Sequence, residues 1–144
     1  LSEALALTVD RIDFEAGVII FWTLKKRTNG SHRAVPVSRQ LLDELEKVHA
    51  VQERQRKREK TLLWPWCRMT GYRRVKEVME QAGVEGPHAT PKGLRHGFGV
   101  AALERGVPLN MLQKWLGHAD MATTAIYGNA VGLEERHIAE RLWD

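Results

Sequence analysis

Polar side chains of the kinds that bind phosphate groups gather in one stretch of the chain, residues 90 to 129. Lys92 and Arg95 are cations that donate hydrogen bonds to anionic oxygens. His118 can add a further donor, and Tyr127 adds a phenolic oxygen. These residue types predict a site that gathers polar side chains around one phosphate.

Short helices are predicted to carry these side chains. Thr90 followed by Pro91 is a helix start, because threonine supplies an N-cap oxygen and the N–H that proline lacks would be unsatisfied there anyway. Gly106 is a natural stop for this helix. Its stripe at three- and four-residue spacing consists of Leu94, Phe98, Ala101, Ala102 and Arg105. Lys92 and Arg95 lie off this stripe.

A turn and two further helices should follow. Val107-Pro108 makes the turn, and the next helix should end at Gly117, with His118 just past that end. Its apolar stripe consists of Leu109, Leu112, Trp115 and Leu116. A third helix, residues 122 to 126, should carry Tyr127 near its end.

The order of these residues resembles the tyrosine recombinase, or phage integrase, family. In that family a His/Lys-x-x-Arg box is followed by Leu-Gly-His and then by the nucleophilic tyrosine. Here the same order is Lys92-x-x-Arg95, Leu116-Gly117-His118 and Tyr127. Two further segments resemble family segments, LSEALALTVDRID at the start and HRAVPV at residues 32 to 37. The resemblance therefore covers almost the whole chain.

The resemblance implies a role for each residue in breaking a DNA strand. Tyr127 attacks a phosphodiester, and Arg95 and His118 stabilise the charge that builds on the phosphate oxygens. Lys92 assists phosphate binding, and a lysine of the hairpin between residues 22 and 37 protonates the departing 5′ oxygen. Neither a metal nor another cofactor is implied, and no His has close carboxylate or Cys partners at ligand spacing.

Each residue also has a plain structural interpretation. A tyrosine near a helix end is most often half-buried packing. His118 alone could stabilise a helix C-terminus, and Arg95 alone could form a surface ion pair. Their joint order favours the catalytic interpretation.

Two features depart from the family pattern. The family's first arginine lies immediately before the residue matched by Leu1, so we expect this chain to lack it and to be inactive alone. Lys92 stands where many members have His, and as a cation at pH 7 it can donate to phosphate but cannot accept a proton. Glu3, which the family keeps beside the first arginine, could orient that arginine or be an ordinary first-turn Glu.

The N-terminal half predicts the sheet of an α+β fold that is otherwise mainly helical. β-rich runs at residues 12–14 and 18–23 are separated by Glu15-Ala16-Gly17. Asn29-Gly30 predicts a tight turn before a return strand at residues 32–37. We therefore expect a helical catalytic domain with a small three-stranded antiparallel β-sheet, as the resemblance also implies.

The catalytic lysine of the hairpin is assigned from the family's spacing to the proline matched by Pro36. Alternation along the strand then favours Lys26, while Lys25 points the other way. The alternative is an exposed basic ribbon that contacts DNA phosphates, formed by Lys25, Lys26, Arg27 and Arg33. Arg68 and Arg73 could also contact DNA, although solvated arginines are the default.

Further helices are predicted around these elements, the first at residues 2–8. The second begins at Ser38, and its inward-facing side chains should be Leu41, Leu42, Leu45 and Val48. The charged residues 51–61 should form a solvated helix end or loop, and contact with the DNA backbone is the alternative. Another helix is predicted to stop at Gly83, and one of its faces should carry Tyr72, Val75, Val78, Met79 and Ala82. The last helix, with Leu133, His137, Ile138 and Leu142, could dock on a neighbouring subunit, as in the family, or within its own chain.

Composition limits the class of protein. A chain of 144 residues with 43% hydrophobic residues can bury one core, so we expect a single catalytic domain over residues 1–144. Because the chain begins with Leu1, we expect a fragment whose longer protein carries a DNA-clamping domain upstream. The net charge of +4 suits a polyanionic partner. The single Cys67 excludes an internal disulfide, and no apolar run reaches the ~20 residues of a membrane span. We expect a soluble, cytoplasmic, nucleoid-associated protein.

Three functions fit these patterns. The first is a site-specific recombinase or integrase of a mobile element, which acts on double-stranded DNA as a homo-oligomer, a tetramer. The second is a type IB topoisomerase, which relaxes DNA without exchanging partners. The third is a non-catalytic DNA-binding module, because the two helices around Gly106-Val107-Pro108 also resemble a helix-turn-helix, although the second helix is largely apolar.

Overall fold

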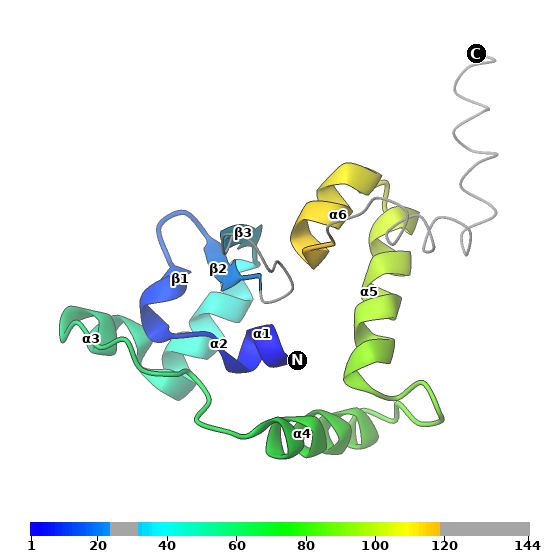
Figure 1. Cartoon of the computed structure of the whole chain (residues 1–144), viewed down its shortest axis with the longest axis horizontal. Helices are drawn as coiled ribbons and strands as arrows, with labels where there is room; N and C mark the ends of the chain where they lie inside the picture. Colours follow the sequence, from blue (N-terminus) through cyan, green and yellow to red (C-terminus); the bar gives the residue numbers. More distant parts are fainter. Residues whose placement is uncertain (24–31, 119–144) are drawn as a thin grey trace, which may run out of the picture. The chain divides into compact units, whose positions relative to one another are not determined.

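The computed structural model describes residues 1–23 and 32–118 of the chain. The chain divides into two compact units, residues 1–74 and residues 75–144. The described residues form helices and one three-stranded antiparallel sheet (Figure 1). The predicted fold class, α+β and mainly helical, is therefore confirmed. The single domain expected over residues 1–144 stays a prediction.

The first unit is built on a sheet in the order β1-β2-β3, with β1 at Ile12–Asp13, β2 at Val18–Trp22 and β3 at His32–Pro36 (Figure 1). Gly17, at a positive φ of 68°, makes the predicted turn between β1 and β2. Both pairings are antiparallel, and the last pair of the β2–β3 ladder is Trp22 with His32. The predicted sheet is confirmed.

Short helices cover this sheet and share its core. They are α1 at Ser2–Leu5, the 3₁₀ turn η1 at Val9–Arg11, α2 at Arg39–His49 and α3 at Val51–Arg56. The buried cluster of this unit consists of Leu7, Val9, Ile12, Ile19, Leu42, Leu45, Val51 and Leu63. Helix α1 is shorter than the predicted helix 2–8, because Leu7 leaves the helix and is buried in this cluster.

Helix α2 buries a different stripe from the one predicted. The Ser38 side chain caps its start, accepting the N–H of Leu41 at 3.2 Å, as expected of an N-cap serine. Leu42 and Leu45 are buried, but Leu41 and Val48 are exposed. Only the side of the helix that carries Leu42 and Leu45 meets the core, and the prediction that Leu41 and Val48 point inward is wrong.

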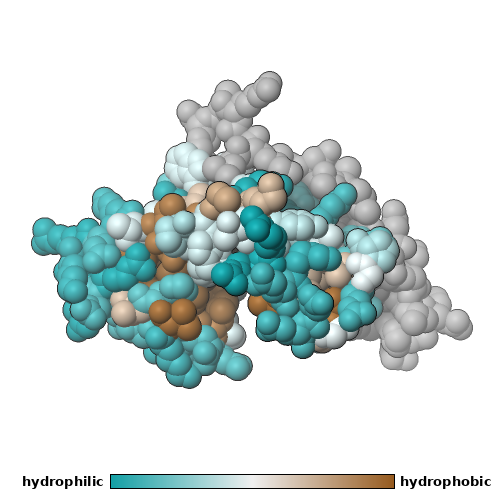
Figure 2. Space-filling view, turned by 90° about the horizontal axis from the view of Figure 1, so that it is seen from below, coloured by the Kyte–Doolittle hydropathy of each residue, from teal (hydrophilic) through white to brown (hydrophobic). Residues whose placement is uncertain are grey.

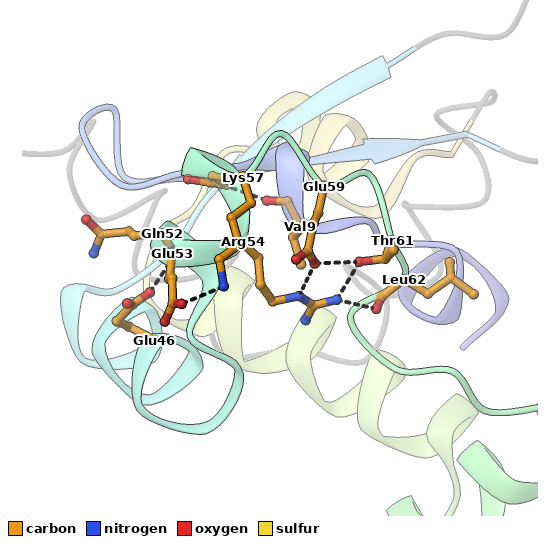
Figure 3. Close-up of polar contacts among 10 residues, drawn as sticks. Val9, Glu46, Gln52, Glu53, Arg54, Lys57, Glu59, Thr61 and Leu62 are labelled. Atoms are coloured by element: carbon orange, nitrogen blue, oxygen red, sulfur yellow. Dashed lines mark hydrogen bonds and ion pairs between the residues drawn. The ribbon is translucent and has the colours of Figure 1, made fainter.

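Several residues of the charged segment 51–61 form hydrogen bonds within the first unit, and Figure 3 shows those around Arg54. The Arg54 guanidinium donates to Glu59 at 3.1 Å, to the Thr61 hydroxyl at 2.6 Å and to the Leu62 carbonyl at 3.2 Å. Val51, at the start of α3, is fully buried. The predicted solvated helix end and loop is confirmed, because α3 ends at Arg56 and the charged residues Arg56, Lys57, Arg58 and Lys60 are exposed, although Arg54 holds the loop through internal hydrogen bonds.

Helix α4, Arg68–Gln81, ends where the sequence predicted. Gly83 has a φ of 70°, and the Val84 N–H donates to the Met79 carbonyl at 2.8 Å, which closes the helix end. Of the predicted apolar face, Met79 is buried but Tyr72 and Val78 are exposed. Figure 2 shows brown, apolar patches on a surface that is otherwise mostly hydrophilic. The predicted stop is confirmed, and the residues predicted to share one face differ in burial.

The described part of the second unit contains α5, Pro91–Glu104, and α6, Leu109–Leu116 (Figure 1). Its buried cluster consists of Ala102, Leu103, Leu112 and Leu116. The stripe predicted for α6 is confirmed at Leu112 and Leu116, whereas Leu94 and Phe98 of α5 are exposed. The cluster lies near the C-terminal end of α5, which explains why the predicted stripe is wrong at Leu94 and Phe98.

The start of α5 approaches the preceding loop so closely that only glycine fits at residue 93. A Cβ atom placed on Gly93 would lie 1.8 Å from the backbone oxygen of His88. No side-chain rotation can relieve a clash with a backbone atom. Gly93 therefore fixes how the loop enters the helix that carries Lys92 and Arg95.

No helix within residues 1–23 and 32–118 has the length and apolar character that crossing a bilayer would require.

Core packing around Leu42 gives a first prediction. Leu42 is 0% exposed, so Leu42→Ala should leave a cavity and lower the free energy of unfolding by about 2–5 kcal/mol. Val48 lies on the same helix and is 71% exposed, so Val48→Ala should change it by less than about 0.5 kcal/mol. Chemical denaturation of both variants measures the difference, and equal losses would contradict this core.

The close approach at Gly93 gives a second prediction. Gly93→Ala should lower the free energy of unfolding by about 1–3 kcal/mol, because the loop or the helix must shift. Gly97 lies in the same helix with open space where its Cβ would stand, so Gly97→Ala should stabilise the protein by about 0.5–1 kcal/mol. Thermal unfolding compares the two, and stabilisation by Gly93→Ala would refute the clash.

Candidate active site

Helix α5 presents two of the predicted site residues in its first two turns. The Thr90 hydroxyl accepts the Gly93 N–H at 3.0 Å and Pro91 occupies the first helical position, so the predicted helix start is confirmed. Lys92 and Arg95 are three residues apart and lie on neighbouring positions of the helix surface. Lys92 is exposed, whereas Arg95 is half-buried.

The end of α6 fixes the backbone of His118. Gly117 has a φ of 69°, the left-handed conformation that ends many helices. The His118 N–H donates to the Gln113 carbonyl at 3.1 Å, and the Gln113 side-chain amide donates to the His118 carbonyl at 3.3 Å. His118 is therefore held immediately past the helix end, as the sequence predicted.

Arg95 joins these two helices. Its guanidinium Nη2 donates a hydrogen bond to the backbone carbonyl of Leu116, two residues before His118. The last carbonyls of a helix carry partial negative charge, which attracts a cation at this position. The contact uses one of the five guanidinium donors and orients the others. The structure thus brings Arg95 to the Leu116-Gly117-His118 segment, with Lys92 one turn away along α5.

Several predicted residues fall outside the described part of the chain. Lys25, Lys26 and Arg27 belong to residues 24–31, and Tyr127 to residues 119–144. The predicted helix at 122–126 and the last helix belong to the latter range as well. Their assignments stay predictions.

The structure describes the other arginines assigned to DNA, at residues 33, 68 and 73. Arg33 is not part of an exposed ribbon, because its side chain is 10% exposed and pairs with Glu3 at 2.5 Å. Arg68 donates to the Ser2 hydroxyl at 2.5 Å, and Arg73 is exposed on α4. The assignment of these three arginines to DNA contact stays a prediction. Arg33 differs from the other two because it was predicted to lie on an exposed ribbon and is largely buried.

The pair between Glu3 and Arg33 is the contact that sequence reasoning missed. The acidic residue was expected to orient an arginine before Leu1 or to lie in an ordinary first helical turn, and its partner instead lies 30 residues away on β3. Local patterns identify caps and turns, but they do not say which strand meets which helix. Only the packing of α1 beside the sheet reveals the pair.

Within residues 1–23 and 32–118, no three His, Cys, Asp or Glu side chains gather in a way that could hold a metal ion.

Comparisons with known proteins identify the family. The model of the phage integrase family matches residues 1–131. The tyrosine recombinase XerA of Pyrococcus furiosus is 32% identical over 151 aligned residues, which cover 98% of this chain and 49% of the relative. The chain spans about half the length of the relatives it matches.

Solved structures agree with this match at the level of the fold. The crystal structure of XerA recombinase has a TM-score of 0.73 and 23% identity, covering 97% of this chain and 52% of that chain. A structure of the XerH site-specific recombinase bound to palindromic difH substrate, a post-cleavage complex, has a TM-score of 0.74 and 22% identity, covering 99% of this chain and 42% of that chain.

The match of the family model over residues 1–131 agrees with the order of Lys92, Arg95 and His118 along α5 and α6. This chain belongs to the phage integrase family.

Proposed function

We propose that this chain is the catalytic part of a site-specific DNA recombinase, which cleaves and rejoins strands through a covalent 3′-phosphotyrosyl intermediate. The family membership supports this function, and the named relatives are tyrosine recombinases. The double-stranded DNA partner is supported by the XerH structure, whose protein is bound to a difH substrate.

The observation that carries the proposal is the contact between Arg95 and the Leu116 carbonyl. It draws a half-buried cation to the segment that ends in His118. A phosphate seated there accepts hydrogen bonds from Arg95 and His118 as negative charge builds on its non-bridging oxygens. Lys92, exposed one turn earlier on α5, adds a third donor.

The reaction is a transesterification at phosphorus. The phenolic oxygen of Tyr127 forms a bond to phosphorus, and the bond from phosphorus to the 5′ oxygen breaks. The phenolic proton is lost to solvent, and Lys26 supplies a proton to the departing oxygen, which leaves as a free hydroxyl. Because the phosphotyrosyl link conserves the energy of the broken phosphodiester bond, attack by a 5′ hydroxyl rejoins the strand without ATP.

The assembly proposed on DNA is a homotetramer, with the C-terminal helix of each subunit docked on its neighbour. Strand exchange needs cleaved ends from two duplexes held together, which a tetramer provides. We place this protein in the cytoplasm, on the nucleoid.

Tyr127→Phe tests the covalent step. In the full-length protein this variant should form no protein–DNA adduct on denaturing gels, because the ring keeps its shape but loses the attacking oxygen. Binding to the same DNA should stay within about twofold in a mobility-shift assay, since one neutral hydroxyl adds little to binding that phosphate contacts dominate. Tyr72→Phe is the matched control and should form normal adduct. Adduct formation by Tyr127→Phe would refute the proposal.

Arg95→Lys tests the phosphate contact. Lysine keeps the positive charge but cannot donate to the Leu116 carbonyl and to phosphate through one planar group. The rate of adduct formation should fall by about 10²–10³-fold. Arg105 is exposed at the other end of the same helix and donates to the Ala101 carbonyl of that helix, so Arg105→Lys should change this rate by less than about twofold. Equal rates for the two variants would contradict the assignment of Arg95.

A further inference from the structure

The end of helix α6 is closed by two backbone hydrogen bonds. The His118 N–H donates to the Gln113 carbonyl at 3.1 Å, and the Gly117 N–H donates to the Lys114 carbonyl at 3.2 Å. Gly117 has the left-handed conformation, with a φ of 69°. This pair of bonds is the Schellman arrangement, which satisfies carbonyls that the helix itself leaves unpaired. It fixes the N–H side of His118.

Gln113 adds a contact that this arrangement does not require. Its side-chain amide donates from Nε2 to the His118 carbonyl at 3.3 Å. Residue 113 therefore accepts the N–H of His118 through its own carbonyl and donates to the carbonyl of His118 through its side chain. Because both backbone polar groups of His118 are held, its backbone is restrained on both sides of the Cα atom.

The packing of α6 fixes Gln113 in turn. Leu112, its neighbour in the chain, is 0% exposed, and Leu116 is buried as well. Both leucines belong to the buried cluster that α5 and α6 share. Arg95 on α5 donates to the Leu116 carbonyl. The backbone of Gln113 is therefore anchored in the core, and its amide extends this anchoring to His118.

We propose that Gln113 is a positioning residue for His118. By holding the backbone of residue 118 on both sides, it sets where the imidazole can meet a phosphate, because a side chain on a fixed backbone has only a few rotamers. This inference rests on the proposed function, in which His118 donates a hydrogen bond to the phosphate that is cleaved. Gln113 itself touches neither DNA nor the reacting atoms in this role.

A double-mutant cycle separates positioning from a general contribution to folding. A positioning residue acts through its partner, so its substitution should no longer change the rate once the imidazole of His118 is removed. A residue that only supports the fold slows the reaction by the same factor with or without that imidazole. The interaction between the two substitutions is therefore the quantity to measure.

The experiment measures the rate of protein–DNA adduct formation by the full-length protein at saturating DNA, where weaker binding does not contribute. Gln113→Met keeps the length of the side chain but loses the donor, and it should slow adduct formation by about 10–100-fold. His118→Ala should slow it by about 10²–10³-fold. Adding Gln113→Met to His118→Ala should slow it by less than about a further twofold. The affinity of Gln113→Met for DNA should change by less than about twofold, because phosphate contacts dominate binding.

Two further variants serve as controls. Gln113→Glu keeps the shape of the side chain, but its carboxylate only accepts hydrogen bonds, so it should slow adduct formation at least as much as Gln113→Met. It also supplies the cycle if Gln113→Met yields no folded protein. Asn110→Leu removes an amide from an exposed position of the same helix and should leave the rate within about twofold.

The possible outcomes distinguish this inference from the proposed function. A rate for the Gln113 variants within about twofold of the unsubstituted protein would overturn the inference alone. An equal loss with and without the imidazole of His118 would also overturn it, because Gln113 would then support only the fold. If His118→Ala reacts at the normal rate, the phosphate contact assigned to His118 fails and the inference with it. Adduct formation by Tyr127→Phe would refute the proposed function itself.

Discussion

The hydrogen bond from Arg95 to the Leu116 carbonyl is the interaction on which the candidate site depends. It joins α5, which carries Lys92 and Arg95, to the helix end that holds His118. The apolar cluster that includes Ala102 and Leu112 fixes the two helices beneath it. Because helix carbonyls attract a cation, this contact orients the guanidinium. In the proposed function, little reorganisation is then needed when charge develops on the phosphate.

The same principle recurs in the first unit with a different acceptor. Arg33 is held by a carboxylate and a hydroxyl, as Arg95 is held by a backbone carbonyl. In each unit a guanidinium with several donors in one plane links secondary structure elements, which an ammonium group could not do with the same geometry. Charge alone therefore does not identify an arginine that contacts DNA, because part of the basic composition of this chain serves internal contacts.

Features set by local chemistry could be predicted from the sequence, and features set by packing could not. The helix start at Thr90-Pro91 and the helix ends at Gly83 and Gly117 depend on a few neighbouring residues, and all three are confirmed. The buried faces of α2 and α5 depend on which elements pack against them, so the predicted stripes are wrong at Leu41, Val48, Leu94 and Phe98. For the site, the order of motifs predicted the family correctly, but the partner of Glu3 lies 30 residues away and no local pattern names it.

The most direct test of this account identifies the residue that carries the DNA. The full-length protein is reacted with its DNA and digested with nuclease and trypsin, and the peptides are analysed by mass spectrometry. The two tyrosines of the chain fall on different peptides, Tyr127 on residues 115–136 and Tyr72 on residues 69–73. We expect a nucleotide linked to the peptide that contains Tyr127. Strand cleavage with the nucleotide on the Tyr72 peptide, or on neither, would contradict it.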